Sequence, residues 1–155
     1  MERLDALTAG KRVVQWGSVL GPLFSKEVLV EIWDSQAGEL EAGLAELESS
    51  GLIRARLEGD RIRFEFKHAL IQDAAYQSMV IATRQHIHAR IAVHLKETSD
   101  RRSSNLELLA HHLTRAGSID EAVHCWLGAG HAAASKFADG EAVVHFAMAR
   151  DLLEK

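Results

Sequence analysis

The hydrophobic pattern of this chain changes its period once, at His68. Over residues 61–67 apolar and charged side chains alternate, which is the period of a β-strand. From Leu70 onward the apolar positions recur at helical spacing, as in an amphipathic helix. Because one element cannot have both periods, we expect a strand to end and a helix to begin here. We therefore place a domain boundary between residues 67 and 68.

The region before this boundary is predicted to contain helices followed by a hairpin. Apolar stripes at helical spacing predict three helices, over residues 9–20, 26–33 and 36–49. Two alternating segments follow at residues 52–57 and 61–67, and a glycine-containing turn separates them. Three helices and a two-stranded hairpin are typical of a winged helix-turn-helix domain.

Residues with capping chemistry mark the ends of these helices. Ser25 and Ser35 are expected to cap the N-termini of the second and third helices. The Gly21-Pro22 pair is expected to end the first helix. Gly51 is expected to end the third in a left-handed conformation, which glycine adopts at low cost.

The region from residue 68 to 155 is predicted to be helical throughout. The junction helix that begins at His68 continues to Val80, and further helices are predicted at residues 84–95, 106–116, 119–134 and 140–153. A weak internal repeat relates residues 121–129 to residues 141–149: in each copy small, aromatic and small side chains follow at spacings of four and three. Such a pattern favours stacked helical hairpins.

The composition and net charge of the chain leave the predicted arrangement of helices and strands unchanged. The chain has 155 residues, is 47% hydrophobic and 26% charged, and carries a formal net charge of −4. No apolar run reaches the roughly 18 residues of a membrane helix, and the N-terminal sequence lacks the apolar core of a signal peptide. The single cysteine, Cys125, cannot form an internal disulfide, which favours a reducing compartment. We therefore expect a cytoplasmic protein without a membrane partner.

The end of the chain resembles a tetratricopeptide repeat. The Trp, Gly, Ala, Phe and Ala positions of that repeat are occupied by Trp126, Gly130, Ala142, Phe146 and Ala149. The match is partial, because the expected leucine and two aromatic residues are replaced by Ala129, Ala133 and Asp139. The resemblance implies paired helices in an array, with protein binding as a common use.

Nearly the whole chain is also similar to one region of the bacterial STAND-type signalling ATPases, which are often fused to a class III nucleotide cyclase. The similarity is carried in order by LGPLFSKEVLVEIW, LEAGLAELESSGLI, FEFKHALIQDAAYQSM, RQHIHARIAVHL and LLAHHLTRAGSIDEAVHCWLGAGHAA. In that family such blocks follow the ATPase module as a winged helix and tetratricopeptide-like helices. The resemblance implies that this chain is a fragment of a longer protein, whose missing ATPase domain would bind ATP or ADP.

The chain itself is expected to be non-catalytic and to need no cofactor. A phosphate-binding P-loop requires a glycine-rich turn followed by Gly-Lys-Ser/Thr, whereas the Gly10-Lys11 pair is followed by Arg12. Nothing in the sequence fixes serine, histidine and aspartate side chains near one another. The 9 histidines are interpreted as scattered surface and packing residues, because neighbours such as His111 and His112 diverge on a helix, so no metal site is predicted.

Binding of DNA, the commonest use of a winged helix, is disfavoured by the charges of the third helix. This helix would enter the major groove, yet it carries four glutamates and no lysine or arginine, and phosphates repel carboxylates. The hairpin instead alternates cationic and apolar residues. Its cations are expected to share one solvent face and to form a basic docking face, made of Arg54, Arg56, Arg61, Arg63 and Lys67.

His68 is the one residue to which the STAND resemblance assigns a ligand. In related ATPases a histidine at the end of the winged-helix sheet contacts the phosphate of bound ADP and helps to hold the inactive state. The segment from Phe66 to Ile71 is similar to that Met-His-Asp-Leu-Leu motif, with Ala69 in place of the aspartate. The alternative is that His68 only caps or packs at the junction.

The favoured hypothesis is a non-catalytic regulatory region that relays nucleotide state to a helical protein-interaction array. Its partners would be other proteins or neighbouring domains of the same chain, and the junction helix from His68 to Met79 would carry the motion. The alternative is a free-standing winged-helix DNA-binding regulator with a helical dimerisation or sensing tail. A third reading is a structural scaffold without a switch.

Overall fold

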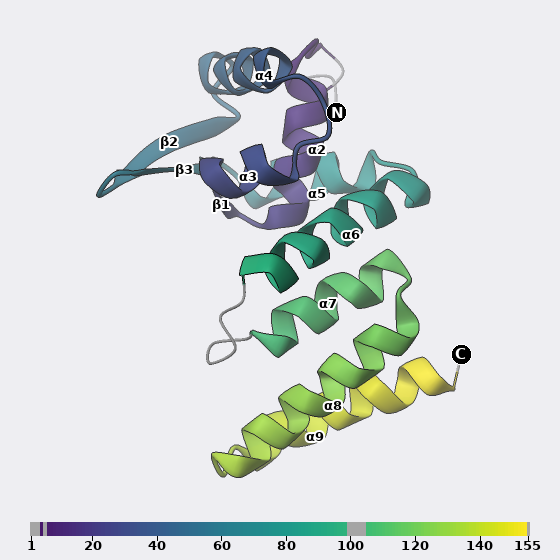
Figure 1. Cartoon of the computed structure of the whole chain (residues 1–155). Coiled ribbons are helices and arrows are strands. Elements are labelled where there is room, and N and C mark those ends of the chain that lie inside the picture. Colours follow the sequence, from purple (N-terminus) through teal and green to yellow (C-terminus); the bar gives the residue numbers. More distant parts are fainter. Residues whose placement is uncertain (1–3, 5, 99–104, 155) are drawn as a thin grey trace. The chain divides into compact units, whose positions relative to one another are not determined.

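The chain is mainly helical and contains one small antiparallel sheet (Figure 1). The computed structural model describes residue 4, residues 6–98 and residues 105–154. The chain forms two compact units, residues 1–87 and residues 88–155. Among the described residues, none of the helices combines the length and the apolar character needed to cross a lipid bilayer.

The first unit combines helices with a three-stranded sheet. Its elements are α2 (Gly10–Leu20), β1 (Leu23–Ser25), α3 (Lys26–Ile32), α4 (Ala37–Ser49), β2 (Ile53–Glu58), β3 (Arg61–Phe66), α5 (Ala69–Gln77) and the start of α6 (Ile81–Thr98). The strand order is β1-β3-β2, and both pairs are antiparallel. The predicted helices and hairpin are therefore confirmed. Strand β1 was not predicted, because three residues are too short to show an alternating pattern.

Two of the three predicted helix caps are confirmed. The hydroxyl oxygen of Ser25 accepts a hydrogen bond from the backbone N–H of Val28 at the start of α3. Gly51 has a φ of 71° after the end of α4, where the N–H of Leu52 donates to the carbonyl of Leu47. The prediction for Ser35 is wrong: Gln36 occupies the N-cap of α4, and the Ser35 hydroxyl donates to a carboxylate oxygen of Glu39 instead.

Aromatic rings and close helix contacts form the core of the first unit. The Phe24 ring packs against Phe64 and Phe66 of β3 at centroid distances of 5.7 and 5.6 Å. Helices α2 and α4 cross at Gly43, where a Cβ atom would lie 2.8 Å from the carbonyl oxygen of Ala9. A larger side chain at Gly43 would therefore push the two helices apart.

The junction helix, which was predicted to continue from His68 to Val80, is shorter in the structure. Helix α5 ends at Gln77, and a turn at residues 78–80 separates it from α6. The hydroxyl of Ser78 donates to the carbonyl of Ala75, and Ser78 accepts from Gln15 of α2. Leu70, predicted to lie on the apolar stripe, is 79% exposed. Because α5 lies wholly within the first unit, α5 is not the element that connects the two units.

The second unit consists of the rest of α6 and three further helices, α7 (Leu106–Ala116), α8 (Ile119–Ser135) and α9 (Asp139–Leu153). The boundaries of α7, α8 and α9 agree with the predicted helices to within one residue, whereas α6, predicted over residues 84–95, is three residues longer at each end. The Trp126 ring lies in the core and its indole N–H donates to the hydroxyl of Thr114 at 3.0 Å. A Cβ atom at Gly130 would lie 2.5 Å from the Phe146 ring, so glycine permits α8 and α9 to approach closely.

The two units meet in sequence at a different place from the predicted boundary. The change from strand to helix occurs near residues 67 and 68 as expected, but the first compact unit extends to Ile87. The division falls within α6, whose first part belongs to one unit and whose remainder belongs to the other. Helix α5 and the first part of α6, up to residue 87, belong to the sheet-containing unit, and α5 packs on α2.

Candidate functional site

The register of the β2–β3 hairpin places its charged residues on one face of the sheet. Directly opposite pairs are Arg54 with Glu65, Arg56 with Arg63, and Glu58 with Arg61. Opposite residues of an antiparallel pair lie on the same face of the sheet. The opposite face carries Ile53, Ala55, Phe64 and Phe66. The hairpin extends away from the helices of its unit (Figure 1), so its basic face is open to solvent.

Two carboxylates partly neutralise this basic face. Arg56 forms an ion pair with Glu65 at 2.6 Å, and Arg63 forms one with Glu58 at 3.1 Å. Arg54, Arg61 and Lys67 are exposed and form no ion pair with any described residue. Arg61 lies close enough to Glu27 to contribute to the lowered pKa of that carboxyl, although the hydroxyl of Ser25 is the main cause. The face therefore keeps three exposed cations that no described carboxylate pairs with.

The glutamates of α4 bind within the first unit. The Glu46 carboxylate accepts the backbone N–H groups of Thr8 and Gly10 at 3.0 and 2.6 Å, and thereby caps the N-terminus of α2. These backbone donors lower the pKa of Glu46. Glu39 accepts from Ser35, which lowers its pKa, and also pairs with Arg12.

A third α4 glutamate, Glu41, pairs with Lys26 of α3 at 2.8 Å. The acidic character of α4 thus has a structural cause that its sequence did not reveal, because the partners of Glu46 and Glu41 lie at least 15 positions away along the chain. Glu48 is exposed near the end of the helix. No cation lies on α4 to bind a phosphate.

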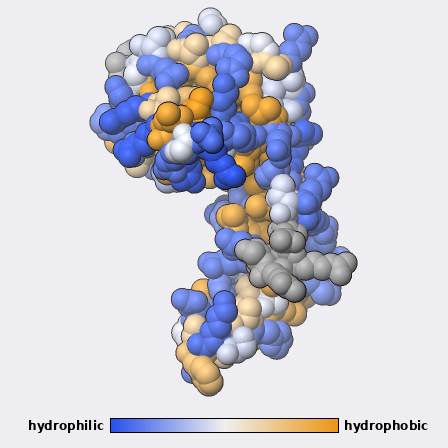
Figure 2. Space-filling model, turned by 60° about the vertical axis from the view of Figure 1, so that its left-hand side comes forward, coloured by the Kyte–Doolittle hydropathy of each residue, from blue (hydrophilic) through white to orange (hydrophobic). Residues whose placement is uncertain are grey.

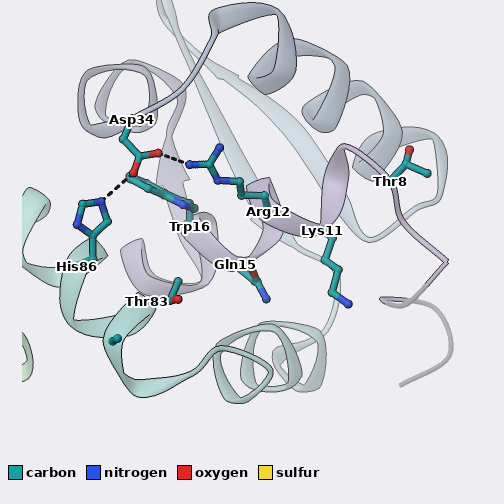
Figure 3. A pocket seen from close by; sticks show the side chains of 9 residues that line it. Thr8, Lys11, Arg12, Gln15, Trp16, Asp34, Thr83 and His86 are labelled. Carbon is teal, nitrogen blue, oxygen red and sulfur yellow. Dashed lines mark hydrogen bonds and ion pairs between the residues drawn. The ribbon is translucent and has the colours of Figure 1, made fainter.

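A polar hollow of about 640 Å³ lies on the first unit (Figure 3). Its lining comes from α2, from the segment after α3 and from α6, and consists of Thr8, Lys11, Arg12, Gln15, Trp16, Asp34, Ala82, Thr83 and His86. Asp34 accepts from Arg12 and lies 2.8 Å from Nε2 of His86. Sequence reasoning missed this cluster, because Asp34 and His86 are separated by 52 positions.

The charges in this hollow largely satisfy one another. Arg12 pairs with both Asp34 and Glu39, and its guanidinium lies over the Trp33 ring at 4.9 Å. The Trp16 ring contacts the edges of Trp33 and His86. This arrangement joins the start of α6 to α2 and to the end of α3. We interpret the cluster as a set of structural contacts that hold the start of α6 against the rest of the first unit, rather than as an open binding site for an anion.

His68 lies at the N-cap of α5, with an exposed side chain and an extended backbone. Its side chain accepts no capping hydrogen bond from the helix, while its carbonyl accepts from the N–H of Ile71 at 3.0 Å. His68 does not line the polar hollow. It follows directly after Lys67 of the basic docking face, so the two predicted features are adjacent in the chain.

Two histidines form a buried pair that the sequence did not predict. His88 and His112 are 2% and 4% exposed, and their Nδ1 atoms lie 2.9 Å apart. Burial, with a smaller contribution from His111, lowers the pKa of His112 to about 4. The sequence indicates surface and packing histidines, but it does not predict that two packing histidines contact each other. In the described part of the chain, no three His, Cys, Asp or Glu side chains are grouped as metal ligands would be.

Comparisons with known proteins give one relative. No family model and no solved structure matches the chain. An uncharacterized protein of Rhizobium meliloti (strain 1021) is 28% identical over 153 residues. The match covers 97% of this chain but only 15% of the length of that protein.

Proposed function

We propose that this chain is a non-catalytic regulatory region of a longer signalling ATPase of the STAND type. In this proposal the first unit is a winged helix that docks on a nucleotide-binding domain, and the second begins a tetratricopeptide-like array that binds proteins. The length of the relative is in keeping with such an arrangement, since the aligned region is a small part of it.

The observation that carries the proposal is the distribution of charge over the first unit. The hairpin presents Arg54, Arg61 and Lys67 to solvent, whereas the helix that would enter a DNA groove is acidic and binds three of its four glutamates within the first unit. A small surface with three available cations suits contact with an acidic or phosphate-bearing domain. The exposed side chain of His68, next to Lys67, is compatible with the ADP phosphate contact that the family resemblance implies.

Helix α6 replaces the junction helix in this mechanism. The boundary between the two units falls within α6, and the Asp34–His86 contact joins its first part to the first unit. Docking of the basic face in one nucleotide state and its release in the other would change the position of α6. A relay of this kind requires different contacts in the two states.

The test uses the full-length protein that contains this region. A triple variant with Arg54→Glu, Arg61→Glu and Lys67→Glu is expected to release bound ADP at least tenfold faster, because the docked state loses its cations. His68→Ala is expected to weaken ADP retention further. The matched control is Arg56→Gln, which removes an arginine already paired within the hairpin. Unchanged ADP release in the triple variant would exclude the docking role.

The second candidate function, a DNA-binding regulator, is supported only by the basic hairpin. Fluorescence anisotropy of a labelled random-sequence duplex, titrated with this chain at low and moderate salt, separates the candidates. Binding that weakens steeply with salt would show that the hairpin engages phosphates and would favour the regulator. Absence of binding at low salt would exclude it.

A further inference from the structure

The turn between α8 and α9 holds a phenylalanine in a backbone conformation that suits glycine. Among the described residues, Phe137 is the one residue other than glycine with a positive φ, 59°. A side chain crowds its own backbone in this left-handed region, so a phenylalanine is strained there. Phe137 is also 91% exposed, so almost none of its apolar surface is covered. Burial in the fold therefore does not offset the strain.

The internal repeat shows the same turn without a phenylalanine. The step that relates residues 121–129 to residues 141–149 also relates Gly117 to Phe137. Gly117 follows α7 with a φ of 84°. In both turns the next backbone N–H donates, at 3.0 Å, to a carbonyl in the last turn of the preceding helix. Glycine is thus sufficient for this turn. We interpret the strained, exposed ring at the second turn as a contact for another molecule.

A pocket of about 190 Å³ lies beside the strained turn. It is formed by the start of α7, the end of α8 and the start of α9, and its lining includes Lys136 and Ala138 on either side of Phe137. Hydrophobic residues reach the surface at this end of the second unit (Figure 2). Sites for drug-sized molecules typically enclose about 300–1,000 Å³, so this smaller pocket suits a single long side chain.

His145 gives the pocket a polar group that lacks a partner in the fold. Its side chain is 7% exposed and stacks on the Trp126 ring at a centroid distance of 5.4 Å. Its buried Nδ1 has no hydrogen-bond partner among the described residues, whereas buried polar atoms normally have one. Nε2 of His145 lies 3.9 Å from a carboxylate oxygen of Glu107, which is too far for a direct hydrogen bond. When Nδ1 carries the hydrogen, Nε2 and the carboxylate are two acceptors that one ammonium or guanidinium group can bridge.

The charges of the pocket indicate the sign of its ligand. The exposed residues Glu107 of α7 and Glu141 of α9 contribute two carboxylates to the lining, and Lys136 contributes one ammonium group. This balance attracts a cation, whereas an anion would meet two like charges. An aromatic ring beside the pocket adds attraction for a cationic side chain.

We propose that this pocket binds the lysine or arginine side chain of a partner peptide, and that Phe137 packs against the neighbouring residues of that peptide. The cationic group lies between Nε2 of His145 and the carboxylate of Glu107, and the aliphatic stem lies along the alanines of α8. All groups of the site lie within residues 105–145. The inference rests on the proposed protein-binding role of the second unit and names the chemistry of the partner.

Titration of the whole chain with peptides, followed by nuclear magnetic resonance, tests the proposal. The probes are acetylated peptide amides of sequence Gly-Leu-X-Leu-Gly, in which X is lysine, arginine, norleucine or glutamate. We expect the lysine and arginine peptides to shift the backbone signals of Glu107, Phe137 and Glu141. They should bind at least tenfold more tightly than the norleucine peptide, which lacks the charge. Equal binding of the lysine and norleucine peptides, or no shifts with millimolar peptide, would overturn the proposal.

Two changes of charge examine the sign of the bound group. Lys136→Ala should tighten binding of the lysine peptide about twofold or more, because it removes a like charge. Weaker binding to this variant, with preference for the glutamate peptide, would mean that the pocket holds an anion, contrary to the proposal. Glu107→Gln should weaken binding about tenfold, whereas Glu154→Gln, at the other end of α9, is the matched control. Melting temperatures of both are compared, because Glu107 also complements the N-terminus of α7.

Phe137→Gly separates docking from folding. Glycine adopts a φ of 59° without strain, so the melting temperature of the second unit should not fall. Binding of the lysine peptide should weaken severalfold, because the exposed ring is lost. Unchanged peptide binding would exclude Phe137 from the site. These measurements concern the second unit alone, so their failure would leave the ADP-release test of the hairpin unaffected, and the reverse also holds.

Discussion

The two units are stabilised by contacts of different range along the chain. In the second unit the core lies between consecutive helices, and small residues and Trp126 meet at spacings of three and four. In the first unit several of the decisive contacts are polar and long-range: Gly10 with Glu46, Asp34 with His86, and Gln72 with the Ser18 carbonyl, which is 54 positions away. The hydrophobic periodicity of the sequence therefore accounts for the packing of the second unit well and for that of the first unit only in part.

Removal of the central tryptophan should affect the second unit most. Trp126→Ala is expected to lower the free energy of unfolding by about 3–5 kcal/mol, because it leaves a cavity between α7 and α8 and removes the hydrogen bond to Thr114. Urea unfolding monitored by hydrogen exchange in α8 measures the effect. Leu127→Ala is the control, since that neighbour is 38% exposed. Equal losses in both variants would show that Trp126 is not the centre of this core.

The buried histidine pair should make the second unit sensitive to acid. One Nδ1 of His88 or His112 must donate and the other must accept, so the pair is stable when both rings are neutral. His112 has a pKa of about 4, below its ordinary value, because it is buried. Below about pH 6.5 the unfolded chain gains a proton at this histidine that the folded chain does not bind. Stability is thus complete above that pH and decreases as the pH falls toward 4.

The expected loss over this window is roughly 3 kcal/mol. It is measured by urea unfolding of the second unit at pH 7, 6, 5 and 4.5. His111 lies beside the pair. Its pKa is also lowered, mainly by burial and then by Arg115, so His111→Gln measures how much of the pH dependence comes from His111. His112→Gln should flatten the pH dependence. A slope that persists in His112→Gln would assign the acid sensitivity to another group.

The long-range cap of α2 should make the first unit depend on a single residue of another helix, Glu46 of α4. Glu46→Gln is expected to lower the melting temperature of the first unit, because the carboxylate that accepts the N–H groups of Thr8 and Gly10 becomes a neutral amide. The pKa of Glu46 is lowered in the folded chain. Its contribution is therefore present above the ordinary carboxyl pKa and is lost as the pH falls through the folded value.

The measurement compares thermal unfolding of Glu46→Gln and the unaltered chain between pH 7 and pH 3. The difference should shrink toward acid pH, as the native carboxyl becomes protonated. Glu48→Gln, two positions later on an exposed part of α4, should behave like the unaltered chain. Faster hydrogen exchange at the start of α2 in Glu46→Gln alone would confirm that the cap acts there.

Whether contacting residues lie near or far apart along the chain also decides whether the sequence could predict the contact. The helices of the second unit and the two alternating strands of the hairpin were predicted, because Ala122, Trp126 and Arg54 lie in patterns whose period is local. The cap by Glu46 and the Asp34–His86 contact were not, because nothing near these residues in sequence marks their partners. The His88–His112 pair was missed for a related reason: it joins α6 and α7 through residues that lie 24 positions apart in the chain.

The smallest effect should come from the paired arginine of the hairpin. Arg56→Gln removes an ion pair with Glu65, yet the Arg56 side chain is 51% exposed, and exposed pairs contribute little. The free energy of unfolding should change by less than about 0.5 kcal/mol. Urea unfolding at low and high salt checks this, with Arg54→Gln as the unpaired comparison on the same strand. A loss well above that limit would mean that this ion pair fixes the hairpin, and the basic face would then have a structural as well as a docking role.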